Sequence, residues 1–354
     1  MTQRPTPRAL EQFWSKSVED LATLVPSTMR PGESERHRMY SLLLMAIVRL
    51  QWNGNKYGDT GDYGRWRMEQ RLMSTPSREA IYRSGTYLGH NIAALAVNGD
   101  GHVIDYDFNH NNVFDSSVEH AESRLIRRIF SLDQLYEPSE FFGRGPNARR
   151  RRFATRADDE GKESQREASK GVSTTQFATL LNDVTVYTSL ESCAQCSGIM
   201  TLASVKAVVY LQWDQGQFLI GNIMYQVTRG AELGFVSPLP ISGAEIELPY
   251  FSELNKGNDE FSQEVGKDPF FKGGGSNRNK PSITSFLCTD VALAIYQRAA
   301  DEFKELTEVT VTCPEYTPDG ATQGALSNAE VRSEVRDFWE YARAINNRGT
   351  AHRV

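Results

Sequence analysis

Two short stretches of the chain hold the side chains best suited to chemistry. The first is His120-Ala121-Glu122, and the second is the Cys-x-x-Cys pair formed by Cys193 and Cys196. One imidazole and two thiolates are typical zinc ligands, and three protein ligands leave one position of a tetrahedral zinc open. Glu122 then remains as a carboxylate that can move protons. This set of groups favours zinc-dependent hydrolysis, in which activated water attacks an amidine-type carbon and ammonia leaves.

An alternating pattern predicts a β-hairpin ahead of the His-x-Glu stretch. Residues 92–97 and 103–108 are typical of strands, and the segment between them contains an Asn-Gly pair suited to a tight turn. An amphipathic helix follows, with Asp115 or Ser117 as its expected N-cap. The His-x-Glu pair therefore falls in the first turn or so of a helix that follows a hairpin.

The Cys-x-x-Cys pair is predicted to begin a second helix. We expect a strand over Val184–Thr188, the helix over Cys193–Ala203, and further strands over Val205–Trp213 and Ala244–Leu248. Residues i and i+3 share a helix face, so both sulfurs can reach one ion. The helix N-terminus favours anions, which biases the two thiols towards the thiolate form that binds metal.

Helical patterns on both sides of this part predict extensions. Helices are expected over Glu33–Trp52, Ser282–Leu306 and Asn328–Ile345. The predicted division is a helical N-terminal extension (1–86), a zinc-dependent core (87–257) with an insertion near 138–175, and a C-terminal extension (258–354). That last part is expected to be a linker, with a loop over 256–280, followed mostly by helices. Strand-helix-strand order with short connections favours an α/β sandwich for the core.

Composition narrows the class of protein. The 354 residues are 39% hydrophobic and 24% charged, which is ordinary for a globular protein. A net charge of −6 argues against a wholly basic nucleic-acid binder but leaves room for a local basic patch. Four cysteines are too few for a disulfide scaffold. No secretory signal or membrane-length apolar run is visible, so a cytoplasmic location without a membrane partner is expected.

From about Leu88 to Asp259 the chain resembles the cytidine deaminase-like superfamily, closest to the branch of tRNA adenosine deaminases and guanine or cytosine deaminases. The residues that carry the resemblance are the hairpin, Asn109, His120-Ala121-Glu122, the run 186–200, the strand Val205–Trp213 and the run Gly221–Met224. The resemblance implies a three-layer α-β-α fold with a five-stranded mixed sheet whose last two strands are parallel, and it implies self-association as a homo-oligomer, such as a homodimer. One departure is Ser192, which stands where the superfamily pattern has proline. Proline is not a ligand, so we expect this change to be tolerated.

The resemblance also implies roles for individual residues. His120, Cys193 and Cys196 are expected to bind Zn²⁺, Glu122 to carry protons, and Asn109 to hydrogen-bond the base. Two neighbours of Asn109 are weaker candidates: His110 for touching the substrate, and Phe114 for stacking on a base or packing as an apolar staple.

The predicted activity is a zinc-dependent hydrolase that replaces the exocyclic amine of a nucleobase with oxygen. The substrate is expected to be a free base, nucleoside or nucleotide, and the alternative is adenine or cytosine within RNA or single-stranded DNA. The run Arg149–Arg152 favours the polymer if it contacts phosphates, but a solvated loop balanced by nearby acidic residues explains it as well.

Three other interpretations remain open at this stage. Cys288 and Cys313 are able to complete a structural four-cysteine zinc site, although the His-x-Glu stretch is then a coincidence. The Cys-x-x-Cys pair alone suits a thioredoxin-like redox role, but no suitable βαβ context precedes it. A zinc-stabilised interaction or nucleic-acid-binding protein without turnover is the third.

Overall fold

The structure is a computed structural model of the chain. It describes residues 11–13, 15–24, 28–52, 90–111, 116–135, 181–230, 235–265, 282–306, 311–322 and 324–346. Phe114, the run Arg149–Arg152 and the insertion predicted near 138–175 lie outside these residues. No described helix is long and apolar enough to cross a membrane.

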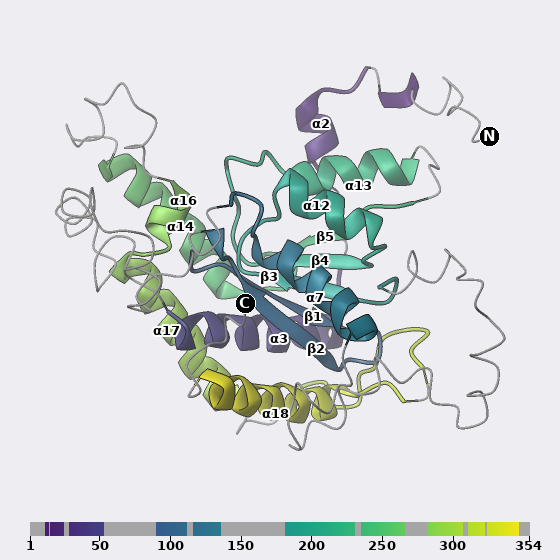
Figure 1. Ribbon diagram of the computed structural model, residues 1–354, viewed down its shortest axis with the longest axis vertical. Coiled ribbons are helices and arrows are strands. Elements are labelled where there is room, and N and C mark those ends of the chain that lie inside the picture. Colours follow the sequence, from purple (N-terminus) through teal and green to yellow (C-terminus); the bar gives the residue numbers. More distant parts are fainter. Residues whose placement is uncertain are drawn as a thin grey trace.

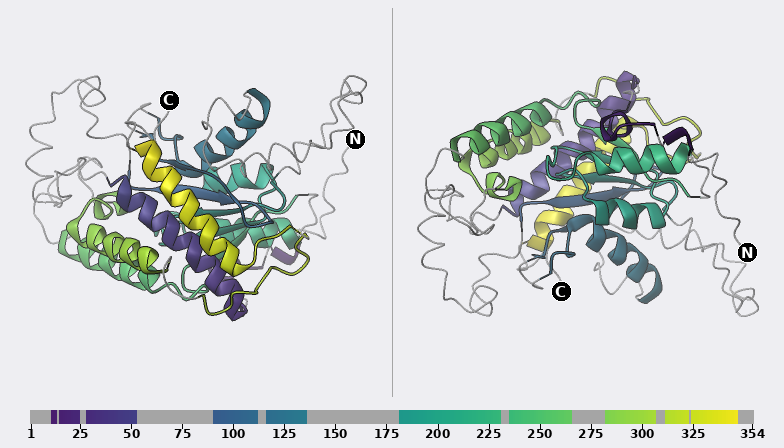
Figure 2. Two further views of the ribbon diagram at one scale, coloured as in Figure 1. Left: turned by 90° about the horizontal axis from the view of Figure 1, so that it is seen from below. Right: turned by 90° about the horizontal axis from the view of Figure 1, so that it is seen from above.

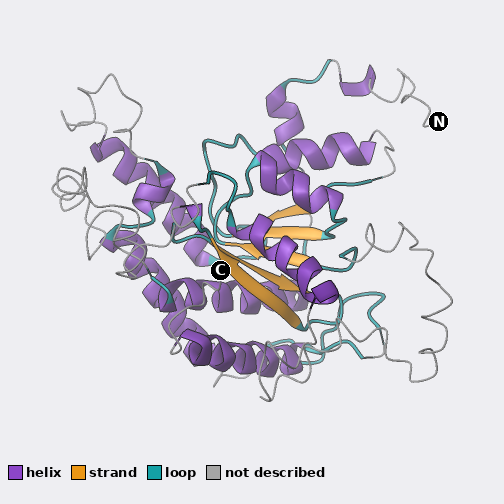
Figure 3. Cartoon of the chain, in the orientation of Figure 1, coloured by secondary structure: helices purple, strands orange, loops and turns teal. Residues whose placement is uncertain are grey.

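A five-stranded mixed sheet forms the centre of the molecule (Figure 3). Its strands are β1 (Ala93–Val97), β2 (Val103–Phe108), β3 (Thr185–Thr188), β4 (Ala207–Tyr210) and β5 (Leu239–Ser242). They lie in the order β2-β1-β3-β4-β5. Strand β1 runs antiparallel to β2 and β3, whereas β3, β4 and β5 are parallel to one another. The predicted mixed sheet with two parallel last strands is therefore confirmed.

Helices cover both faces of this sheet (Figures 1 and 2). The described helices are α2 (Val18–Ala22), α3 (Pro31–Leu50), α7 (Ala121–Leu135), α12 (Ala194–Leu202), α13 (Ile220–Gly230), α14 (Pro249–Val265), α16 (Ile283–Phe286), α17 (Asp290–Leu306) and α18 (Asn328–Asn346). Helices α7, α12 and α13 lie on one face, and α3 lies on the other between α17 and α18. This arrangement is the predicted α-β-α architecture, and helices of both extensions are present.

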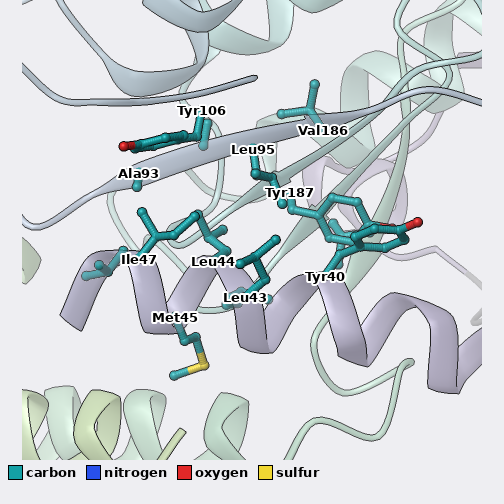
Figure 4. Close-up of a cluster of buried hydrophobic side chains, with 14 of the residues drawn as sticks. Tyr40, Leu43, Leu44, Met45, Ile47, Ala93, Leu95, Tyr106, Val186 and Tyr187 are labelled. Carbon is teal, nitrogen blue, oxygen red and sulfur yellow. The ribbon is translucent and has the colours of Figure 1, made fainter. Parts of the chain in front are cut away.

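Helix α3 supplies much of the apolar core. Every residue from Leu42 to Val48 is at most 2% exposed, so the helix is buried on all sides. Leu43, Leu44 and Ile47 face β1, while Met45 points to the outer helices (Figure 4). A helix that is apolar around its circumference needs neighbours on every side, which α17 and α18 provide. The predicted N-terminal extension thus contributes a helix that packs on the sheet, and the domain boundaries themselves stay predictions.

Strand β5 is displaced from its predicted position. It spans Leu239–Ser242, and the segment Ala244–Leu248 that was expected to form it is a turn. The Glu245 carboxylate accepts hydrogen bonds from the backbone N–H and hydroxyl of Ser242, and Glu247 has a positive φ of 56°. The alternating residues that predicted a strand here therefore form a turn instead. Strand β5 itself contains Pro240, which is tolerated because β5 is an edge strand.

Two helix predictions also need correction. The helix expected over Ser282–Leu306 is broken, because the Thr289 hydroxyl accepts a hydrogen bond from the backbone N–H of Ala292 and starts α17 afresh. Residues 256–265 were expected to belong to a loop, but α14 continues to Val265. Polar residues dominate this part of α14, so it lacks the apolar periodicity from which a helix is predicted.

Candidate zinc and catalytic site

Helix α7 begins one residue after His120. The backbone N–H of Ala121 donates to Asn109 Oδ1 at 2.7 Å, so the amide at the end of β2 caps the helix from a distance. Ser117 lies in a turn ahead of the helix, so this one of the two predicted caps is wrong, and Asp115 lies outside the described residues. Glu122 is in the first turn, as predicted, and His120 sits at the helix end.

Helix α12 presents the two cysteines one turn apart. Cys193 is its N-cap in an extended conformation, and the backbone N–H of Ser197 donates to the Cys193 carbonyl at 2.9 Å. Cys196 lies one turn further and is fully buried. The predicted helix start is confirmed, and the N-terminal end of α12 lies beside that of α7.

Three donor atoms meet between these two helix ends. His120 Nδ1 lies 3.4 Å from Cys193 Sγ and 3.6 Å from Cys196 Sγ, and all three donors lie within 4.8 Å of one another. Tetrahedral zinc with bonds of about 2.3 Å to sulfur and about 2.0 Å to nitrogen places these atoms about 3.5 Å apart. The donor set and its spacing therefore fit a zinc ion.

The electrostatics of the two thiols agree with this fit. Hydrogen bonding from Cys196 and His120 lowers the pKa of Cys193 to about 4, against the opposing effect of burial. The same contact with Cys193, together with burial, raises the pKa of Cys196. The two sulfurs thus compete for one proton, and a divalent cation between them removes that competition by binding both as thiolates.

Glu122 is the carboxylate beside the donor cluster. Its side chain is buried, with 3% exposure, and burial raises its pKa. The hydroxyls of Thr188 and Ser192 donate to Oε1 at 3.1 and 3.2 Å, while Cys196 Sγ lies 3.5 Å from Oε2. One carboxylate oxygen is therefore held by hydroxyls and the other faces the donor cluster. The contacts with Thr188 and Ser192 were not foreseen, although a polar residue at the end of a buried strand was a signal.

A charged cluster fixes the residue before His120. Arg124 and Arg127 both donate to the Glu119 carboxylate at 2.8 Å, and Glu119 lies immediately ahead of the ligand. Arg124 also reaches Asp107 Oδ1 at 3.4 Å, on strand β2. The backbone N–H of His110 donates to the Glu119 carbonyl at 2.9 Å. These contacts attach the start of α7 to the sheet edge.

The loop after β4 borders the same site. The charge of Asp214 interacts with those of Cys193 and His120, and its backbone N–H donates to the Glu191 carboxylate at 3.1 Å. Burial raises the pKa of Glu191 to about 7. Further along this loop, Phe218 is 75% exposed and has a positive φ of 52°. A non-glycine residue in this conformation costs about 1–3 kcal/mol and is often found at functional sites.

The three residues predicted to contact the substrate have different outcomes. Asn109 lies at the site, 3% exposed, with its oxygen already used by Ala121. His110 is 1% exposed, and its Nδ1 lies 3.8 Å from Asp107 Oδ1. Phe114 is not among the described residues, so its expected role is not examined by the structure.

The four-cysteine alternative is contradicted by the positions of the other two thiols. Cys288 lies against the carbonyl of Thr284 and the amide of Asn91, and Cys313 lies beside Thr312. Within the described part of the chain, the group of metal-ligating side chains is His120, Cys193 and Cys196 alone. The site therefore offers three residues that could hold a zinc ion beside a buried carboxylate, and three protein ligands would leave one position open, as in a catalytic zinc.

One comparison with known proteins covers all four residues of this site. Residues 67–212 match the family model of the cytidine and deoxycytidylate deaminase zinc-binding region. One similar solved structure comes from a study of A-to-I editing by tRNA:A34 deaminases at the wobble position of transfer RNA. It is 18% identical, covers 48% of this chain and 89% of its own, and has a TM-score of 0.26. Among curated proteins, none matches this chain. Residues 67–212, which include all three donor residues and Glu122, are thus similar to a deaminase zinc-binding region.

Proposed function

We propose that the protein hydrolytically deaminates a nucleobase, presented as a free base, nucleoside or nucleotide. The observation that carries the proposal is the placement of Glu122 Oε2 against the His-Cys-Cys cluster, 3.5 Å from Cys196 Sγ. A buried carboxylate beside a three-ligand metal site is the arrangement that zinc-dependent base deaminases use. The match of residues 67–212 to a deaminase zinc-binding region supports the same reaction class.

Each side chain has a part in this proposal. His120, Cys193 and Cys196 would hold zinc, which when bound acts as a Lewis acid and makes water nucleophilic near neutral pH. Glu122, whose pKa is raised by burial, accepts a proton from the attacking water at Oε2 and passes it to the ring nitrogen. It then takes the proton of the hydroxyl that the water has added to the base and passes it to the amine, which leaves as ammonia. Its elevated pKa suits a group that must both take and give a proton.

The substrate is held by groups around Glu122. Asn109 Oδ1 is bound to Ala121, so the donor side of this amide is the part that can serve an acceptor on the base. Phe218 belongs to the same loop as Asp214, whose charge interacts with those of Cys193 and His120, and its exposed ring is a candidate for stacking on a base. The acidic net charge of −6 favours a small substrate over a nucleic acid.

The second candidate is the deamination of adenine or cytosine within RNA or single-stranded DNA. The observation that favours it is the basic run Arg149–Arg152, which lies outside the described residues and lies between the two halves of the zinc site in sequence. Phosphate contacts from this run predict binding that weakens steeply as salt rises. Salt-independent turnover of a nucleoside contradicts this alternative.

A substrate screen tests the proposal. Zinc-loaded wild type and Glu122→Gln are incubated with adenine, guanine and cytosine as bases, nucleosides and nucleotides, and with single-stranded DNA and RNA, and ammonia is measured. We expect release from one class of small substrate and a loss of about 10²–10⁴-fold in Glu122→Gln with zinc retained. A matched control is Glu253→Gln on the surface of α14, which should leave the rate unchanged. Equal rates in wild type and Glu122→Gln contradict the mechanism.

Self-association belongs to the same proposal. The resemblance to the superfamily implies a homodimer, and light scattering of the zinc-loaded protein measures its mass. A monomer that retains full activity contradicts this part without affecting the chemistry.

A further inference from the structure

We propose that Ser192 is a positioning residue that orients the Glu122 carboxylate, an inference that rests on the proposed deaminase function. Ser192 is 4% exposed and lies directly before Cys193, between β3 and α12. Its Oγ lies 3.2 Å from Glu122 Oε1. The serine therefore links the stretch that carries the sulfur donors to the carboxylate on the other helix.

The neighbouring hydroxyl cannot do this work alone. Thr188 Oγ1 lies 3.1 Å from Glu122 Oε1 but 2.9 Å from the Leu190 carbonyl, and a hydroxyl has one proton to donate. Whenever Thr188 donates to Leu190, Ser192 is the hydroxyl left for Glu122 Oε1, and another donor to this carboxylate is the backbone N–H of Glu122 itself. The two hydroxyls together satisfy an oxygen that burial separates from water.

The orientation has a direct consequence for the two carboxylate oxygens. With Oε1 held by Ser192, the carboxylate plane is fixed and Oε2 faces Cys196 Sγ at 3.5 Å. A carboxylate free to rotate about its last bond samples many orientations of its plane, because that torsion is broad. The serine hydroxyl therefore favours the orientation in which one oxygen faces the donor cluster while the other accepts its hydrogen bond.

This role explains the departure of the chain from the superfamily pattern. The pattern has proline at this position, and proline has neither a hydroxyl nor a backbone N–H to donate. Serine gives up the fixed φ of proline and adds a donor aimed at Glu122. The replacement of proline by serine is therefore more than tolerated, because the serine hydroxyl hydrogen-bonds the Glu122 carboxylate.

Crystal structures of zinc-loaded wild type, Ser192→Ala, Ser192→Pro and Ser192→Thr test the inference. We expect the Glu122 carboxylate to rotate away from its wild-type position in the alanine and proline variants, and to return in the threonine variant. Zinc content, measured by atomic absorption, should stay the same in all four. The matched control is Ser197→Ala, a buried hydroxyl on α12 that contacts the Ser192 carbonyl at 3.5 Å. An unmoved carboxylate in Ser192→Ala overturns the inference, whatever the activity.

Kinetics add a second readout with cytidine, deoxycytidine, adenosine and guanine as probes. Loss of the hydroxyl should lower kcat about tenfold with KM changed less than about twofold, because positioning acts on the transition state. Ser192→Thr should restore kcat. Wild-type activity with no change in Ser192→Ala overturns the inference and leaves the proposed function standing. No ammonia from wild type with any substrate of the screen described above, with the carboxylate displaced in Ser192→Ala, overturns the function and leaves the positioning role standing.

Discussion

The two faces of the sheet are joined to their helices by different kinds of contact. On the face of α7, Asp105 and Asp107 of β2 pair with Arg128 and Arg124. On the opposite face, Tyr106 between them stacks edge-on against Phe338 of α18 with 5.7 Å between ring centroids. Successive residues of one strand point to opposite faces, so a single strand serves an ionic and an apolar interface.

Strand β3 shows the same division next to the site. Thr188 points towards α7 and contacts Glu122, whereas Tyr187 points towards α3 and contacts His37. The face of α7 therefore holds the ion pairs and hydrogen bonds of the site, whereas the face of α3 is held mainly by apolar packing, to which a few hydrogen bonds such as that of His37 are added. From this difference we infer that the geometry of the site depends mainly on the helix layer of α7, and the stability of the fold mainly on the helix layer of α3. Single substitutions in one layer or the other should therefore change one property more than the other.

The largest effect is expected on the site face. Cys196→Ala should lower zinc affinity more than about a hundredfold, since even outer partners of zinc ligands contribute about 10–100-fold. Competition with a chromogenic chelator measures this. Cys288→Ala is the matched control, because Cys288 is equally buried but lies against Thr284 and Asn91. Zinc loss in the control rather than in Cys196→Ala contradicts the assignment of ligands.

The next effect is expected on the packing face. Leu44 is fully buried in α3, so Leu44→Ala removes apolar contacts and leaves a cavity. The free energy of unfolding should fall by about 2–5 kcal/mol, measured by urea denaturation. Zinc bound per folded molecule should not change, because α3 packs on the opposite face of the sheet from the helices that carry the donor cluster. A variant that lost zinc at full stability would contradict the separation of the two layers.

A smaller effect is expected for Arg124, whose substitution should change both stability and zinc affinity. Its guanidinium pairs with Glu119 and with Asp107, whose pKa is raised by burial against the effect of two arginines. Arg124→Met should cost about 2 kcal/mol of stability, less than breaking an isolated buried pair because Arg128 still contacts Asp107, and lower zinc affinity about tenfold.

Arg127→Met is the matched control for this change. Arg127 pairs with the same Glu119 carboxylate from the same helix, but its side chain is 57% exposed. Exposed pairs contribute about 0–1 kcal/mol, so little change is expected in stability or zinc affinity. Chelator competition and urea denaturation on both variants compare them, and equal losses would show that burial is not what matters.

The sequence predicted the parts of this comparison that depend on local pattern. The spacing of His120, Glu122 and the two cysteines predicted the donor set, and alternation predicted four of the five strands. The fifth was misplaced because alternating residues near Ile246 form a turn, and pairing with β4 chose Leu239–Ser242 instead. The sequence of a short segment does not reveal which other strand it pairs with.

Contacts between distant residues were the other part that local spacing does not contain. Asn109 caps a helix that begins at Ala121, and Ser192 reaches Glu122 across 70 positions of sequence. Each depends on two elements already packed together, so neither residue type nor periodicity reveals it. The resemblance supplied a role for Asn109 towards substrate but not its structural one.

The smallest effect is a pH dependence from the packing face. His37 accepts or donates in a 2.8 Å contact with the Tyr187 hydroxyl, and burial together with the charges of Arg36 and Lys206 lowers its pKa to about 4. Between the ordinary pKa of 6.5 and this value, the unfolded chain binds a proton that the folded one does not, so stability falls as pH falls. From pH 6.5 to 5.5 the loss should be about 1 kcal/mol, measured by urea denaturation. The variant His37→Gln does not titrate, so its free energy of unfolding should fall less over that interval. An identical pH dependence of stability in the variant would show that another group causes the effect. One such cause is zinc release, which also follows protonation of the zinc ligands.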